Sequence, residues 1–168
     1  INYTTGTYGN KFENKFSKFI GNKYSLAICN GTAALEVAIR SLKFPKNSEI
    51  IVTARSFFSS ASCIVNTGHV PVFADVNNLT QNISLKDIEK KISKKTKAII
   101  CVHLSGLPCD MIGIKKIAKK NNLKIIEDCS QAHGASIHNK QVGSFGDIGT
   151  WSFCNDKIIS TLGEGGMI

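Results

Sequence analysis

The sequence has few of the features that mark membrane, secreted or metal-binding proteins. Its apolar runs, such as 98–102, are far too short to span a bilayer, so no membrane association is expected. Its six cysteines form no CxxC pair, and its four histidines have no HxxxH spacing. This usage favours reduced thiols in a cytoplasmic protein over a disulfide framework, and no metal site is expected.

Arginine is also scarce, although the formal net charge is +9. Only Arg40 and Arg55 are arginines, and no strip of aromatic and arginine residues suited to base stacking is present. The positive charge comes mostly from lysine, and eight of the lysines form pairs at helical spacings, opposite apolar positions, which indicates solvated helix faces. These pairs are Lys90-Lys91, Lys94-Lys95, Lys115-Lys116 and Lys119-Lys120. We therefore expect no nucleic-acid partner.

What the sequence does have is an alternation of strand and helix patterns over its 168 residues. Strands are predicted at 25–28, 49–53, 70–74, 97–102, 124–127 and 148–153, and helices at 11–19, 33–42, 59–66, 84–92 and 110–120. Phe12, Phe16 and Phe19 form the predicted apolar stripe of the first helix. Ser84 and Asp87 have the S-x-x-D spacing of a capping box, which predicts the start of the helix at 84–92. The alternation predicts an α/β fold with three layers, in which helices cover both faces of a mostly parallel sheet.

Residues 1–168 are expected to form one domain, because no internal repeat or linker interrupts the alternation. The chain ends on a strand-like pattern directly after the Gly-rich turn 163–166. We therefore expect it to be the N-terminal and cofactor-binding portion of a longer protein.

Polar segments follow four of the predicted strands, at 30–32, 56–58, 103–106 and 128–131. Parallel sheets bind ligands beyond the carboxyl ends of their strands, so one cleft could gather all four segments. The first of them precedes a helix, where it can bind an anion or simply cap the helix.

Two residues stand out among these segments. Asp128 ends a buried strand pattern, and Lys157 lies in a locally apolar segment, unlike the paired lysines. Pyridoxal phosphate (PLP) needs such a carboxylate at its ring nitrogen and such an amine at its aldehyde. A single residue of either type is more often a helix cap or a surface ion pair, so both interpretations remain open at this point.

The order of several longer motifs resembles the DegT/DnrJ/StrS-type sugar aminotransferases, a branch of the fold-type I PLP-dependent enzymes. The resemblance covers nearly the whole chain and includes 31–35, 49–52, 56–57, 71–76, 103–111, 126–135, 152–153 with Lys157, and 163–166. The departures are modest: Phe58-Ser59-Ser60 replaces an Ala-rich helix start, and Ser130 and Trp151 replace the usual residues.

The resemblance implies roles for eight residues. Lys157 would form the Schiff base with PLP and move the proton between the substrate carbon and the cofactor. Asp128 would hold the pyridinium nitrogen, Gln131 would bind the ring hydroxyl, and Phe57 would stack on the ring. The phosphate would be bound by Thr32 and Ser152 together with the backbone of Gly31 and Ala33.

The resemblance also implies the reaction. The family transfers an amino group, usually from glutamate, to a nucleotide-linked keto sugar, with PLP alternating with pyridoxamine phosphate (PMP). Its members are homodimers with shared active sites and a small C-terminal domain, so this portion alone is expected to be inactive. Two alternatives stay open. One is a PLP-dependent sugar dehydratase of the same family, which typically replaces the lysine with histidine. The other is a catalytically silent α/β module that binds a nucleotide or a partner.

Overall fold

The structure, a computed structural model, describes residues 6–168. Its helices are α1 (Thr7–Ile20), α2 (Gly31–Ser41), α3 (Ser59–Asn66), α4 (Leu85–Lys91) and α5 (Met111–Asn121), with a 3-10 turn, η1, at Leu104–Gly106. Its strands are β1 (Ala27–Ile28), β2 (Glu49–Thr53), β3 (Val70–Ala74), β4 (Thr96–Val102), β5 (Lys124–Asp128), β6 (Ser136–Ile137), β7 (Lys140–Gln141), β8 (Ile148–Ser152) and β9 (Gly166–Met167). The predicted order of strands and helices is confirmed, and β2, β3 and α3 have the predicted bounds.

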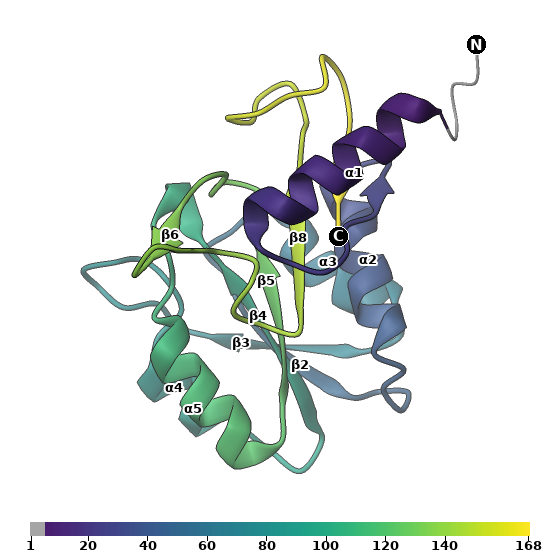
Figure 1. The fold of residues 1–168 in the computed structure, drawn as a ribbon. Coiled ribbons are helices and arrows are strands. Elements are labelled where there is room, and N and C mark those ends of the chain that lie inside the picture. The colour runs from purple at the N-terminus through teal and green to yellow at the C-terminus, as the bar shows by residue number, and fades with distance from the viewer. Residues whose placement is uncertain (1–5) are drawn as a thin grey trace.

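The central sheet has the strand order β1-β9-β8-β5-β4-β2-β3. Its core strands β3, β2, β4, β5 and β8 pair in parallel, whereas β9 pairs antiparallel with both β1 and β8. The short β6–β7 hairpin stands apart from this sheet (Figure 1). The predicted α/β fold with a mostly parallel sheet is therefore confirmed.

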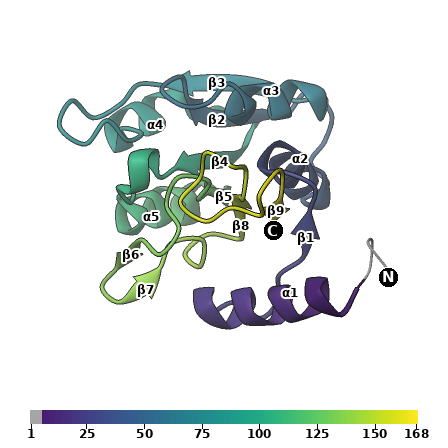
Figure 2. The same ribbon diagram turned by 90° about the horizontal axis from the view of Figure 1, so that it is seen from above.

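Buried residues of the central strands alternate between two apolar clusters, one on each face of the sheet. In β2, Ile50 and Val52 pack with residues of α2 and α3, while Ile51 between them packs with residues of α4 and α5. Figure 2 shows α2 and α3 on one side of the central strands and α4 and α5 on the other. The alternation follows from the two-residue period of a strand, and each fully buried isoleucine contributes about 1.5–3 kcal/mol.

A third apolar cluster joins α1 to β8 and the segment that follows it. Phe16 packs edge-on against Trp151 and Phe153, with ring centroids 5.0 and 5.5 Å apart. The predicted stripe of α1 was wrong in its last member, because Phe19 is 49% exposed. Ile20 is buried instead, since a residue four positions after Phe16 lies on the same helix face.

The start of α4 differs from the prediction in one detail. Ser84 caps the helix, and its Oγ accepts a hydrogen bond from the N–H of Asp87 at 3.4 Å. The Asp87 carboxylate does not complete the predicted capping box, because it accepts from the N–H of Asp75 at 2.8 Å. This bond ties α4 to the end of β3.

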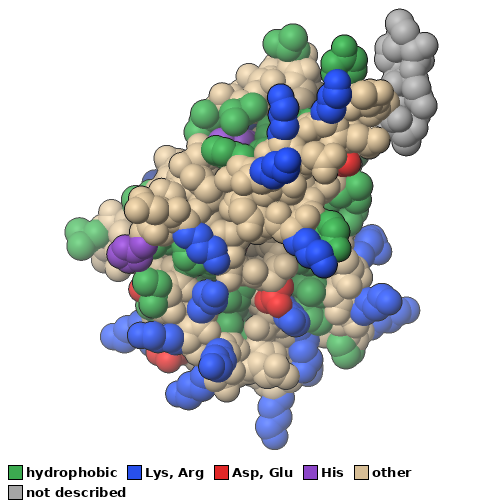
Figure 3. Space-filling model, in the orientation of Figure 1, with side chains coloured by type: hydrophobic (Ala, Val, Ile, Leu, Met, Phe, Trp, Pro, Cys, Tyr) green, Lys and Arg blue, Asp and Glu red, His purple; other side chains and the backbone are tan. Residues whose placement is uncertain are grey.

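The lysine pairs are exposed as predicted, and Figure 3 shows Lys and Arg side chains spread over the visible face rather than gathered in one strip. Lys94 and Lys95 lie in a turn before β4, however, and not on a helix as predicted. Among the helices of residues 6–168, none combines the length and the apolar character needed to cross a membrane.

Candidate functional site

A pocket of about 360 Å³ lies where β4, β5 and β8 end and where α2 and α3 begin. Residues of three of the four predicted strand-end segments, 30–32, 56–58 and 128–131, line it, although Phe58 and Cys129 do not. The segment that follows β8 completes the wall with Cys154, Asp156, Lys157 and Glu164. Figure 2 shows this segment, in yellow, crossing over the ends of the central strands. The pocket therefore gathers parts of the chain that are more than 100 residues apart.

Asp128 is the buried carboxylate of the pocket, with only 5% of the residue exposed. Strand β5 delivers it from the core, because Ile125 and Ile126 before it are buried between the two helical layers. Its Oδ1 accepts from the N–H of Ser130 at 3.1 Å, and its Oδ2 accepts from the hydroxyl of Ser60 at 3.2 Å. Each oxygen keeps room for a further donor.

The N-terminus of α2 forms a second part of the wall. The first N–H groups of a helix have no partner within it, and here Asn30 satisfies two of them. Its side chain accepts from the N–H of Ala33 at 2.8 Å, and its backbone oxygen accepts from that of Ala34 at 3.0 Å. Gly31 and Thr32 line the pocket, so their N–H groups are available to a ligand there. The positive end of the α2 dipole lies at the same place and favours an anion.

Close backbone packing shapes this end of the pocket. A Cβ on Gly31 would lie 2.8 Å from the Cβ of Ser152, and a Cβ on Gly166 would lie 2.5 Å from the carbonyl oxygen of Asn30. Glycine is required at both positions for this reason. The Gly-rich turn predicted at 163–166 therefore brings the backbone into direct contact with the start of α2.

Lys157 lies in the wall with a 22% exposed side chain. Its Nζ donates to Asp156 Oδ2 at 2.7 Å, and this contact with the ammonium group lowers the pKa of the exposed Asp156 carboxyl. The sequence did not single out Asp156. The His133 ring packs against Phe153, with ring centroids 5.5 Å apart, and burial lowers the pKa of the His133 imidazole.

Gln131 and Phe57 lie on other parts of the wall. The Gln131 Oε1 accepts from the N–H of Ser105 at 2.8 Å, which leaves its amide nitrogen as the donor available to a ligand. Phe57 is 63% exposed, so it is not a core residue. Its ring centroid lies 4.7 Å from that of Phe58, which is also exposed. An exposed aromatic ring at a pocket rim is suited to stacking on a flat ligand.

Of the eight predicted site residues, the structure brings seven to the pocket: Gly31, Thr32, Phe57, Asp128, Gln131, Ser152 and Lys157. Ala33 is not among the residues that line it, and its N–H donates to the Asn30 side chain at the helix cap. The fourth predicted segment, 103–106, does not line the pocket either and reaches it only through the bond from Ser105 to Gln131.

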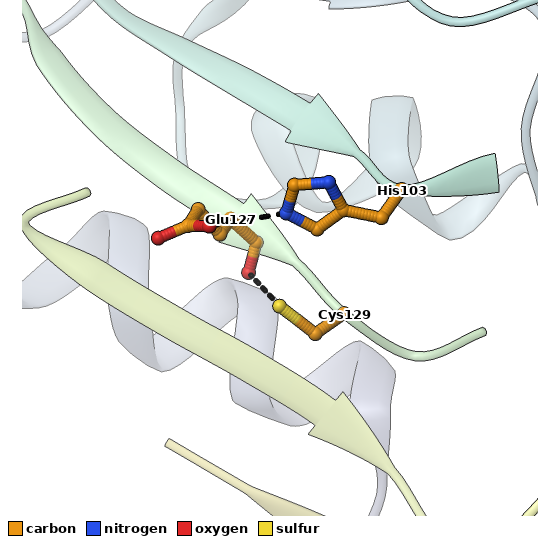
Figure 4. A group of neighbouring side chains, drawn as sticks. All are labelled: His103, Glu127 and Cys129. Carbon is orange, nitrogen blue, oxygen red and sulfur yellow. Dashed lines mark hydrogen bonds and ion pairs between the residues drawn. The ribbon is translucent and has the colours of Figure 1, made fainter. Parts of the chain in front are cut away.

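His103 points into the core instead, towards Glu127 (Figure 4). Both side chains are fully buried, and His103 Nε2 lies 3.1 Å from Glu127 Oε2. His103 Nδ1 accepts from the N–H of Cys109 at 3.0 Å, so the ring carries its proton on Nε2 and donates it to Glu127. Neither ring nitrogen has a lone pair left for a metal.

Cys129 lies within reach of this pair and completes a group with the spacing of metal ligands. Burial, followed by the charge of Glu127, raises the pKa of the Cys129 thiol well above its ordinary value, which favours the protonated thiol. The Glu127 oxygens also accept from the N–H groups of Gly143, Phe145 and Gly146, at 2.6–2.8 Å. The group is therefore a hydrogen-bonded anchor for the loop before β8.

Comparison with known proteins gives consistent results. The model of the DegT/DnrJ/EryC1/StrS aminotransferase family matches residues 2–168. GDP-perosamine synthase of Escherichia coli O157:H7 is 47% identical over 163 residues, which are 97% of this chain and 44% of that protein.

Solved structures of other proteins contain the same fold. An aminotransferase from Psychrobacter cryohalolentis superposes with a TM-score of 0.96 at 51% identity, over 99% of this chain and 42% of that one. NtdA from Bacillus subtilis, solved with bound cofactor PMP, superposes with a TM-score of 0.93 at 34% identity, over 98% of this chain and 37% of that one. The chain thus spans less than half the length of each of these three proteins.

Proposed function

Because the chain belongs to the DegT/DnrJ/EryC1/StrS aminotransferase family, we propose that it supplies the PLP-binding part of an enzyme that transfers an amino group to a nucleotide-linked keto sugar. The observation that carries the proposal is the pocket itself. A buried carboxylate, a lysine amine and a helix N-terminus converge there from β5, the segment after β8, and α2. A surface ion pair between Asp128 and Lys157 is excluded, because Asp128 is buried and Lys157 pairs with Asp156.

The pocket residues fit PLP by their chemistry. The N–H groups at Gly31 and Thr32 and the hydroxyl groups of Thr32 and Ser152 would hold the phosphate at the start of α2. The Asp128 carboxylate would accept a hydrogen bond from the protonated ring nitrogen, and the Gln131 amide nitrogen would donate one to the ring hydroxyl. Bound PLP supplies an electron-accepting ring that stabilises negative charge at the substrate carbon.

Lys157 would act as the acid and base of the reaction. It would bind the aldehyde carbon of the cofactor in the resting enzyme, and after release it would move a proton to or from the substrate carbon. For the first step its amine must leave Asp156 and lose a proton, because only a neutral amine is a nucleophile. Phe57 would cover one face of the ring and keep water from it.

The relatives support the proposed class of substrate. The similarity to GDP-perosamine synthase supports a keto sugar carried on a nucleotide as the amino acceptor. Glutamate is the proposed donor, a second copy of the chain the proposed partner in a shared site, and the cytoplasm the proposed compartment. Residues 1–168 would form the N-terminal and cofactor-binding portion of such an enzyme.

The alternatives have less support. A sugar dehydratase of this family typically carries histidine in place of the lysine, and position 157 is a lysine. A silent nucleotide-binding module has no need of a buried carboxylate and an amine in one pocket.

The test of the proposal is amino transfer by the full-length protein. The protein is incubated with PLP, glutamate and a panel of GDP-, UDP- and dTDP-linked keto sugars, and amino sugar products are identified by mass spectrometry. An amino sugar formed by the wild type and not by Lys157→Ala supports the proposal. A deoxy keto sugar without a new amine would instead identify the dehydratase.

A further inference from the structure

Two serines form a hydrogen-bonded chain that ends on Asp128. The hydroxyl of Ser60, on α3, donates to Asp128 Oδ2 at 3.2 Å, and the residue is only 1% exposed. The Oγ of Ser56 lies 2.8 Å from the Oγ of Ser60 and also lines the pocket. The chain therefore runs from the pocket wall through a buried hydroxyl to the buried carboxylate.

The chemistry of the three groups fixes the direction of this chain. An ionised carboxylate can only accept hydrogen bonds, so the single hydrogen of the Ser60 hydroxyl is committed to Asp128. Ser56 must then donate its own hydrogen to Ser60. Towards the pocket, Ser56 presents only lone pairs and acts as an acceptor.

The carboxylate is held from two sides. The N–H of Ser130 holds Oδ1 from the segment after β5, while Ser60 holds Oδ2 from α3. Two donors on different elements fix the rotation of the carboxylate about its last bond. A hydrogen bond to a charged group in a buried setting is also stronger than one between neutral groups.

Resting on the proposed function, we propose that Ser60, oriented by Ser56, is a positioning residue that fixes the Asp128 carboxylate for the protonated ring nitrogen of PLP. Ser60 acts through Asp128. Its removal would let the carboxylate rotate and would leave Ser56 without its acceptor. The loss should therefore fall on the contact with the ring nitrogen and should spare the phosphate cradle at α2.

The experiment compares the affinities of full-length apoenzyme for PLP and for its 1-deaza analogue, in which C–H replaces the ring nitrogen. Both compounds carry the same phosphate, hydroxyl and aldehyde, so their affinity ratio measures the contact with the ring nitrogen alone. The variants are Ser60→Ala and Ser56→Ala, with Ser62→Ala on the same helix as the matched control. Denaturation curves of each variant report folding separately.

We expect the wild type to prefer PLP over the analogue. This preference should fall about tenfold in Ser60→Ala, as for the loss of one hydrogen bond to a charged group, and about threefold in Ser56→Ala. It should not change in Ser62→Ala. If Ser60→Ala does not fold, Ser56→Ala carries the test.

The outcomes separate this inference from the proposed function. An unchanged preference in the serine variants, with equally weakened binding of both compounds, would assign Ser60 a purely structural role and overturn the inference alone. No preference for PLP in the wild type would overturn the inference and the role assigned to Asp128. No binding of either compound would overturn the proposed function as well.

Discussion

Replacement of Glu127 by glutamine tests the buried network beneath the pocket. Oε1 of Glu127 accepts from the N–H groups of Phe145 and Gly146 at 2.7 and 2.6 Å. Oε2 accepts from the N–H of Gly143 at 2.8 Å and from His103 Nε2 at 3.1 Å. A glutamine amide has only one oxygen, so its NH₂ group must face two of these donors.

The size of the effect follows from that count. Glutamine has the same shape as glutamate, so no cavity forms, and the loss comes from hydrogen bonding alone. Each buried donor without an acceptor costs about 1–3 kcal/mol, so two of them should lower the free energy of unfolding by about 2–6 kcal/mol. The loop 143–146 before β8 should loosen first, because Glu127 holds three of its N–H groups.

Urea denaturation of the full-length protein measures this change. Glu89→Gln on the exposed side of α4 is the matched control, and its unfolding free energy should stay within about 0.5 kcal/mol of the wild type. A Glu127→Gln variant as stable as that control, with the same denaturant slope, would refute the assignment of Glu127 as the loop anchor.

Two further predictions concern pH and packing. Burial raises the pKa of the Glu127 carboxyl, but hydrogen bonds from His103 and the loop N–H groups outweigh it and hold the pKa below the ordinary 4.5. A lowered pKa in the folded state means stabilisation that is present above pH 4.5 and is lost as the pH falls through the folded value. Unfolding free energies measured from pH 6 to about 3 should therefore decline less steeply in Glu127→Gln than in the wild type. In Gly166→Ala, the new Cβ would meet the Asn30 carbonyl at 2.5 Å, so we expect a loss of about 1–3 kcal/mol and weaker PLP binding. Gly9→Ala on α1, where nothing lies within 4 Å, should be neutral or stabilising, and equal stability of the two variants would contradict this packing argument.

Much of the fold was predictable from the sequence because its elements carry strong local signals. β2 and β3 are compact apolar segments, and α5 has Met111, Ile114 and Ala118 on one buried face. The hairpin of β6 and β7 was missed because two strands of two residues each are too short to show a period. Phe19 was predicted in place of Ile20 because two adjacent apolar residues fit the helical pattern almost equally well. Only the packing of α1 against Trp151 decides which of them is buried.

The sequence predicted most of the residues that gather at the pocket, but it did not predict their contacts. The motifs point to Asp128 and Lys157, yet nothing local shows that Ser60 bonds a carboxylate 68 positions further along the chain. The same holds for Glu127. An acidic residue inside a buried strand indicates that its carboxylate has hydrogen-bond donors nearby. The sequence does not show that these donors come from a loop 16–19 residues away and from His103. Such contacts depend on the register of β4, β5 and β8.

The central claim is that Lys157 is the residue that binds the cofactor aldehyde. The full-length protein is mixed with PLP, its visible spectrum is recorded, and borohydride reduction makes any bond to the cofactor permanent before peptide mapping. The account predicts one pyridoxyl label, on the peptide that contains Lys157, and no label at that peptide in Lys157→Ala. A label on one of the exposed paired lysines instead, or no specific label at all, would contradict it.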